Sequence, residues 1–159
     1  MPRMYTVTGT GLTITNAGTD TDLIELTAAA QKPIELCGLD IKVTSEVQEA
    51  QEEWLSLKII RGHTTSGSTP EVTPTPRPCS IVDTAASFTC EMDNTTIASA
   101  GTAHDLASPA MNVRAGYEIF YPERMGFFTD NSVLLVVRLM TTVADDLTMN
   151  ITAWVNEYP

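Results

Sequence analysis

Few residues of this chain are of the types that act as general acids, general bases or nucleophiles at neutral pH. The chain has two histidines, His63 and His104, and each lies in a polar stretch typical of solvated surface. Its adjacent carboxylate pairs, Glu52/Glu53 and Asp145/Asp146, consist of sequence neighbours whose side chains diverge. Because acid–base catalysis needs groups that converge on one reacting atom, neither pair predicts a catalytic dyad.

Three cysteines, Cys37, Cys79 and Cys90, are an odd number without the close spacing of a zinc site or a disulfide framework. We expect them to be free, buried thiols. The chain also lacks Gly-x-Ser-x-Gly, phosphate-loop and His-Glu-x-x-His patterns, and Gly9-Thr10-Gly11 is interpreted as a turn. The sequence therefore predicts a protein that is not an enzyme and that carries no cofactor and no metal.

The charge of the chain disfavours two classes of partner. Its 159 residues include 20 acidic and 9 basic side chains, for a formal net charge of −11. A field of this sign repels phosphate backbones and anionic membrane surfaces, so we expect neither nucleic acid nor membrane as a partner. The segment Met1–Tyr5 lacks the apolar core of a signal peptide, which favours synthesis in a reducing cytoplasm.

The elements that position these residues are expected to be strands, because apolar side chains alternate with threonine-rich polar positions. Between Val133 and Met140 both faces are apolar except at Arg138, which indicates a central strand with its second face covered and an arginine paired with an acid. The side chains expected to be most deeply buried are Leu134, Val136, Leu147, Met149, Ile151 and Val155. The other expected strands are Met4–Val7, Leu12–Thr15, Asp22–Thr27, Ile34–Val43, Trp54–Ile60, Ser87–Met92, Gly116–Tyr121 and Thr148–Asn156.

About eight to ten short strands separated by turn-like segments predict an all-β fold, an antiparallel and jelly-roll-like β-sandwich, in one domain spanning residues 1–159. The alternation of strand Ile34–Val43 changes phase at Cys37-Gly38, which predicts a β-bulge or a bend where the strand changes sheets. Ser45–Glu53 is expected to be a short helix or an acidic loop. Short turns are expected at residues 103–106 and at Asp145-Asp146, the latter joining a hairpin.

Two segments are expected to reach out from the sandwich. Residues 62–78 form a long Thr/Ser/Pro loop, whose proline half favours an open polyproline II backbone that can lie along a partner. Residues 1–22 are interpreted as two short strands around Gly9-Thr10-Gly11, an N-terminal arm or β-hairpin able to add to a neighbour's sheet edge.

Several segments together resemble the small β-sandwich decoration, or cement, proteins of tailed-bacteriophage capsids. They are Pro33–Leu36, Leu57–Gly62 before the Thr/Ser/Pro loop, Asn112–Gly116, and the terminal strands Leu134–Leu139 and Leu147–Val155. The resemblance implies a jelly-roll-like fold, homotrimers near local threefold axes, and binding across capsomer joints with the major capsid protein as partner. It implies no catalytic residues.

On this basis we expect a structural virion protein, made in the host cytoplasm, that stabilises the capsid exterior by bridging subunits. The residues expected to contact other copies or the capsid are Tyr5, Leu12, Ile14, Thr73, Pro74, Pro76, Arg77, Arg114, Tyr117, Phe120 and Tyr121. Two alternatives remain open. One is a tail or fibre accessory subunit, and the other is a carbohydrate-binding β-sandwich module that stacks sugars on Trp54, Trp154, Tyr117, Phe120 and Tyr121.

Overall fold

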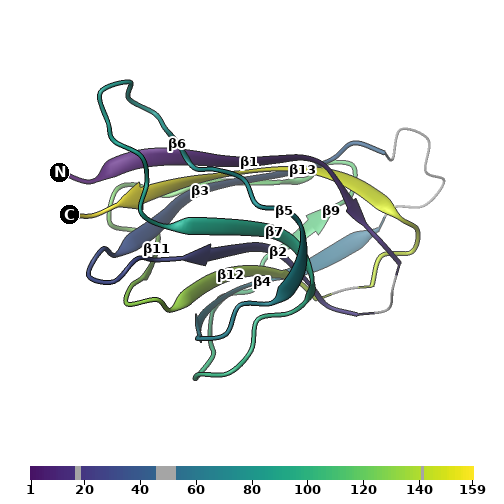
Figure 1. Ribbon diagram of the computed structural model, residues 1–159. Coiled ribbons are helices and arrows are strands. Elements are labelled where there is room, and N and C mark those ends of the chain that lie inside the picture. Colours follow the sequence, from purple (N-terminus) through teal and green to yellow (C-terminus); the bar gives the residue numbers. More distant parts are fainter. Residues whose placement is uncertain (17–18, 46–52, 141) are drawn as a thin grey trace.

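The computed structural model of the chain describes residues 1–16, 19–45, 53–140 and 142–159. Within these ranges every regular element is a strand, and the strands form two antiparallel sheets that pack against each other (Figure 1). The prediction of an all-β sandwich is therefore confirmed. The described residues form 13 strands, more than the expected eight to ten or so, because several short strands pair at the sheet edges.

The first sheet has six strands in the order β10–β3–β13–β1–β6, with β11 also paired to β3. The first and last long strands of the chain lie side by side at its centre, with Tyr5 opposite Val155. The strands of this sheet are β1 (Arg3–Ile14), β3 (Ile34–Val43), β6 (Arg77–Pro78), β10 (Tyr117–Phe120), β11 (Phe127–Thr129) and β13 (Leu147–Glu157).

The second sheet has seven strands in the order β5–β7–β2–β12–β4–β8, with β9 also paired to β4. In both sheets an edge is therefore made of two short strands that share one long neighbour. The strands of this sheet are β2 (Thr21–Thr27), β4 (Trp54–His63), β5 (Ser68–Val72), β7 (Thr89–Thr96), β8 (His104–Ala107), β9 (Ala110–Asn112) and β12 (Leu134–Leu139).

The main core lies between the sheets and is built from the inward-facing alternate residues of the long strands. Along β13 the buried positions alternate as the sequence predicts, with Thr148, Asn150 and Thr152 on the opposite face. All six side chains predicted to be deeply buried are at most 2% exposed, which confirms the predicted strand phases.

Strand β12 is the central strand that the sequence predicts. It pairs with β2 on one side and β4 on the other. Its outer face is covered by a second apolar cluster made of Ile60, Ala98, Leu134 and Val136. The buried Arg138 on the same face pairs with Asp22 of β2, which confirms the expectation that this arginine is held by an acid.

The phase change in β3 is a β-bulge at Cys37. On the neighbouring strand β13, Trp154 pairs with Gly38 and the next residue, Val155, pairs with Leu36, so Cys37 is the extra residue. Strand β3 stays in the first sheet on both sides of the bulge, so it does not change sheets. The bulge instead divides its edge, because β11 pairs before it and β10 pairs after it.

The prediction of an N-terminal arm or hairpin is wrong. Residues 3–14 form one strand inside the first sheet, between β13 and β6. Gly11 adopts a φ of +69° within a bulge, where its amide donates to Asn150 Oδ1 at 2.9 Å, so the strand continues instead of turning back. Gly9 faces the core, where an added Cβ would lie 2.6 Å from Met92 Sδ of the opposite sheet.

Three further expectations about connections are wrong. Residues 62–78 are not irregular throughout, because β5 and β6 lie within them and pair with β7 and β1. Residues 104–107 form strand β8 on the edge of β4, where a turn was expected. Asp145-Asp146 does not close a hairpin, because it joins β12 of the second sheet to β13 of the first.

Most of the expected helix or loop at Ser45–Glu53 lies outside the described residues. Elsewhere, no helix of the length and apolar character needed to cross a membrane is found in the described ranges.

Candidate interaction surface

Both chain termini lie at one end of the sandwich (Figure 1). Segments near this end carry several exposed large apolar side chains. We call this set the terminal surface, and its residues are Met1, Met4, Ile81, Val82, Phe120 and Met125. Among the described residues one other large apolar side chain, that of Trp54 at the start of β4, is equally exposed, and it lies on the second sheet. A gathering of exposed apolar residues is typical of interaction sites, whereas single ones are ordinary surface.

Part of the terminal surface is a shallow groove of about 530 Å³ on the outer face of the first sheet. Its residues come from β1, β3, β10 and β13 and from the flanking turns, and they are Met1, Pro2, Met4, Cys37, Phe120, Tyr121, Glu123, Trp154 and Asn156. The Phe120 side chain, 55% exposed, packs against Trp154 with ring centroids 4.7 Å apart and ring planes at 57°. The groove therefore offers an apolar, partly aromatic wall to a partner.

Gly38 sets the position of these two rings. It lies between Phe120 and Trp154 in the strand register. A Cβ at this position would lie 2.7 Å from Phe120 Cδ1 and 3.0 Å from Trp154 Cε3. Because the glycine has no side chain, both rings lie directly on the sheet and cover its backbone.

The loop between β6 and β7, residues 79–88, carries the two most projecting apolar side chains of the terminal surface after Met1. Ile81 is 101% exposed and Val82 is 83% exposed. The base of the loop is held in place, because the Tyr5 hydroxyl donates to the Thr84 carbonyl at 3.0 Å and the Phe88 ring packs edge-on against Tyr5 at 5.7 Å. A fixed base lowers the ordering cost that a partner would otherwise have to overcome.

This loop also starts beside the groove, because the Cys79 amide donates to the Met4 carbonyl at 2.9 Å. Loop and groove are thus neighbouring parts of one surface.

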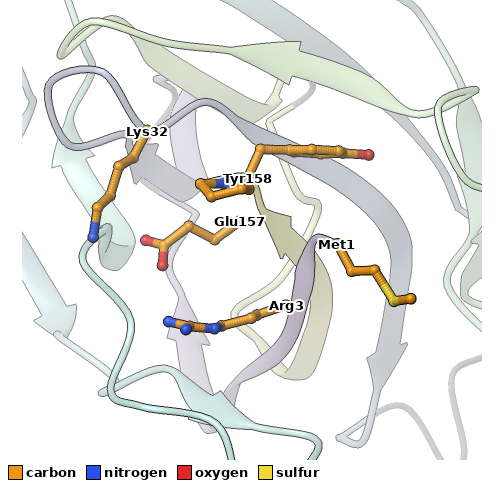
Figure 2. A pocket seen from close by; sticks show the side chains of 6 residues that line it. Met1, Arg3, Lys32, Glu157 and Tyr158 are labelled. Carbon is orange, nitrogen blue, oxygen red and sulfur yellow. The ribbon is translucent and has the colours of Figure 1, made fainter.

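A second hollow, of about 510 Å³, lies at the same end and is shown in Figure 2. The charged ends of Arg3, Lys32 and Glu157 extend toward the same side of it (Figure 2). They fasten the 79–88 loop: Lys32 Nζ donates to Ser87 Oγ at 2.7 Å, the Ser87 amide donates to Glu157 Oε1 at 2.8 Å, and Arg3 Nη1 donates to Thr84 Oγ1 at 2.7 Å. These charges therefore hold the loop that presents the apolar tip.

The residues expected to make contacts differ in how far the structure exposes them. Tyr5, Leu12 and Ile14 are at most 1% exposed, so their prediction as contact residues is wrong. Each points inward from β1 into the core, because that strand lies within the sheet and is not an arm. Phe120 and Tyr121 line the groove together, and their role as contact residues stays a prediction.

The remaining expected contacts are spread over the surface. Thr73, Pro74 and Pro76 lie between β5 and β6, with the threonine exposed and the prolines half-buried, and Arg77 is the exposed first residue of β6. Tyr117 is half-buried at the start of β10, and Arg114 is exposed in the turn before it. Their roles stay predictions.

The sequence reasoning did not name Met4, Ile81 or Val82 as contact residues, although they are exposed on this surface. It named Trp154, which lines the groove, only for the sugar-stacking alternative. The signal for two of these residues is the apolar dipeptide Ile81-Val82 inside a polar, turn-like stretch, where no strand alternation accounts for it. Met4 and Trp154 lie in regular strands, so only the register shows that their outward faces meet.

The histidines and cysteines differ in part from expectation. His63 is only 9% exposed, contrary to the prediction of a solvated side chain, because residues 97–101 fold over it and its Nδ1 contacts the Ala100 carbonyl at 3.2 Å. Cys79 is exposed, contrary to the prediction, whereas Cys37 and Cys90 are buried as predicted. Burial, with the nearby Glu35, raises the pKa of Cys37 to about 11, so this groove thiol is held in its neutral form.

Carboxylates meet at the edge of the second sheet. Asp93 of β7 lies beside Glu71 of β5, and burial, then this neighbour, raises the pKa of Asp93 to about 7. Glu71 Oε2 also accepts the Thr13 amide at 2.7 Å, which ties β5 to β1 of the other sheet. In the described part of the chain, no three His, Cys, Asp or Glu side chains are placed as a metal site.

No protein-family model, no curated protein and no solved structure matches the chain, so the geometry of the terminal surface is the starting point for its function.

Proposed function

We propose that the chain is a structural virion protein that binds the outer surface of a phage capsid and stabilises it by bridging capsid subunits. The observation that carries this proposal is the terminal surface, whose apolar side chains are exposed although the sandwich has a complete core of its own. Burying one such Ile, Val, Phe or Met side chain contributes roughly 1.5–3 kcal/mol. A partner that covers the loop tip and the groove therefore gains several kcal/mol per copy.

The proposed partners are the major capsid protein and other copies of this chain, arranged as a homotrimer. The sequence resemblance to decoration proteins supports the trimer. The edge strand β6 is two residues long and ends in Pro78, which has no amide hydrogen to donate. A partner strand would find few backbone hydrogen bonds there, which favours a partner that binds through side chains. Weak contacts repeated over a capsid lattice add avidity.

The charge of the chain supports a position outside the capsid. A net charge of −11 repels the packaged genome and keeps particles soluble and mutually repelling when it faces the solvent. The charged groups near the terminal surface are partly neutralised among themselves, since Glu157 lies with Arg3 and Lys32 beside the same hollow. Docking of this end would therefore bury little uncompensated charge.

The test is to mix the purified protein with heads assembled without it, then to measure occupancy by cryo-electron microscopy and the temperature at which the genome escapes. We expect saturable binding to the head exterior and a higher release temperature. The double variant Ile81→Asn/Val82→Asn should lower occupancy at limiting protein concentration at least tenfold, because about 1.4 kcal/mol is already a factor of ten.

The matched control is Trp54→Ser, which removes an apolar side chain of 64% exposure from the other sheet and should leave occupancy unchanged. Equal loss in both variants, or no binding to heads, would contradict the proposal. Density on tails alone would favour the accessory-subunit alternative. Binding to a glycan array that is lost in Phe120→Ala would favour the carbohydrate-binding alternative.

A further inference from the structure

The outer face of the second sheet holds a polar cluster that the proposed capsid contact does not use. The members of this cluster on the strands are buried or half-buried, whereas its Ser66 is exposed. The cluster lies beneath residues 64–67, the connection between β4 and β5, and beside residues 97–101. Its members are Asp22 and Glu25 of β2, Ser66 and Gly67 of the connection, Glu91 and Asn94 of β7, and Arg138 of β12.

Glu25 and Glu91 are directly opposite each other on neighbouring strands, and like charges in such a pair destabilise a sheet. The Ser66 hydroxyl lies between them, 2.6 Å from Glu25 Oε2 and 2.8 Å from Glu91 Oε2. A hydroxyl has one hydrogen and can donate to one of these two oxygens only. The second short contact becomes a hydrogen bond of its own when one of the two carboxyl groups is protonated and donates to Ser66 Oγ.

Of the two carboxyl groups, Glu25 is protonated more readily than Glu91. Both carboxyl groups accept a further hydrogen bond, Glu25 from the Gly67 amide and Glu91 from Asn94 Nδ2. Glu25 is 1% exposed, whereas Glu91 is only partly buried, so water stabilises the charged form of Glu91 better. Burial raises the pKa of Glu25 from its ordinary value of 4.5 to about 6, and the nearby Asp22 adds to the rise against the lowering effect of Ser66 and Gly67.

The charged groups around Glu25 leave it without a cation of its own. Asp22 faces it from its own strand and Glu91 from β7. Arg138 of β12 is committed to Asp22, with Nη2 3.0 Å from Asp22 Oδ2, and to the Ala98 carbonyl at 3.1 Å. On β4, His63 lies at the far end of this face against Ala100.

The cluster fastens two segments to the sheet. The Gly67 amide donates to both Glu25 oxygens at 3.0 Å, and Thr65 exchanges backbone hydrogen bonds with Ser99 at 3.0 and 2.9 Å. Residues 97–101 in turn include Ala98, part of the apolar cluster over β12. An attachment at Ser66-Gly67 thus also supports the cover of the sheet's outer face.

We propose that Glu25, Ser66 and Glu91 form a pH-dependent hydrogen-bonded contact. This contact holds residues 64–67 and 97–101 against the second sheet in mild acid and releases them near neutral pH. When Glu25 loses its proton to solvent, the Glu25 and Glu91 carboxylates compete for the single Ser66 hydrogen, and the nearby Arg138 is already committed to Asp22. This device is independent of the proposed capsid contact, which lies on the terminal surface.

The sign follows from the raised pKa of Glu25. Opening exposes Glu25 to water, so it removes the burial that raises the pKa of Glu25 together with the Ser66 and Gly67 contacts that lower it. Because burial is the largest of these effects, the closed form between the ordinary and the raised value holds a proton that the open form has lost, and closure weakens as pH rises through this window. A pKa raised from 4.5 to about 6 changes the opening equilibrium roughly eightfold between about pH 5 and about pH 7.5.

The experiment is amide hydrogen exchange of the whole protein at about pH 5 and about pH 7.5, with protection corrected for the intrinsic exchange rate. We expect peptides covering residues 64–68 and 97–101 to lose roughly eightfold protection at the higher pH and to exchange faster than β13 at both pH values, as local opening requires. Infrared spectroscopy should show a buried carboxylic-acid carbonyl band at the lower pH that disappears at the higher one.

The carboxyl of Asp93 has a pKa of about 7 and would give an acid band of its own, so both measurements are made in Asp93→Asn. This control variant should keep the pH-dependent protection and one acid band, that of Glu25. Adding Glu25→Gln, which keeps the shape of a neutral side chain and can donate to Ser66, should remove both signals. Equal protection at the two pH values, or a pH dependence that persists in Asp93→Asn/Glu25→Gln, would overturn the proposal. If that double variant does not fold, absence of the acid band in Asp93→Asn does so. Protection at about pH 7.5 that is restored by calcium alone would also overturn it, since the cluster would then be a cation site.

Discussion

Replacing Arg138 by methionine should destabilise the sandwich more than any substitution of an exposed charge. The guanidinium is 7% exposed and donates from Nε and Nη2 to the two oxygens of Asp22, which is itself fully buried. It also donates to the Ala98 carbonyl at 3.1 Å. Methionine keeps the apolar stem but leaves the Asp22 charge in the interior with the Ala98 amide as its remaining donor.

Breaking a buried ion pair from one side costs about 3–5 kcal/mol, because the other charge is left uncompensated. For a domain of this length each kcal/mol lowers the melting temperature by about 2–4 °C, so the expected drop is roughly 6–20 °C. Urea denaturation followed by tryptophan fluorescence measures the free energy of unfolding, and an unchanged slope shows that the unfolding transition is comparable.

Lys58→Met is the matched control on the same sheet. Lys58 pairs with Asp105 at 2.7 Å, but both side chains are more than a third exposed, so its loss should cost less than about 1 kcal/mol. In Asp22→Asn/Arg138→Met the free energy of unfolding should partly recover, because the buried charge of Asp22 is then removed together with its partner. A cost of Arg138→Met similar to that of Lys58→Met would refute this reasoning.

Three further predictions concern the core, the thiols and the edge of the second sheet. Ile151→Asp should cost several kcal/mol and prevent folding at moderate temperature, whereas Asn150→Asp, one residue away on the exposed face, should melt like the unaltered protein; equal melting would show that the strand phase is wrong. A thiol reagent at mildly alkaline pH should modify Cys79 in the folded protein and the other two cysteines only after denaturation, which mass spectrometry can count. Because burial and Glu71 raise the pKa of Asp93 to about 7, stability should fall as pH rises from about 4 to about 7, and Asp93→Asn should flatten that slope in thermal melts; an unaltered slope would count against the carboxyl pair.

Much of the strand architecture follows from local alternation. The period of two in residues 148–155 identifies the face that enters the core, and the apolar character of both faces around Val136 identifies a central strand. The phase change at Cys37-Gly38 likewise predicts the observed bulge, because one extra residue reverses the side-chain direction of everything that follows.

The interaction surface was only partly predictable for a related reason. Phe120 and Tyr121 stand out in the sequence as aromatic residues at strand spacing, and they do line the groove. Tyr5, Leu12 and Ile14 show the same alternation as an exposed arm would, yet they are buried. Alternation shows that a strand has an apolar face, and it does not show whether that face meets the chain's own core or a neighbour.

The amino-acid sequence by itself determined the fold class, the phases of the long strands and the pairing of Arg138 with an acid, because these depend on side-chain direction within short segments and on the cost of burying an unpaired charge. Only the tertiary structure decided that β12 and β13 lie in different sheets and that Glu25, Ser66 and Glu91 converge. It also decided that the rings of Phe120 and Trp154 pack over Gly38. These features depend on which strands pair and in what register, and that choice is made by hydrogen bonds and packing between residues far apart in the chain.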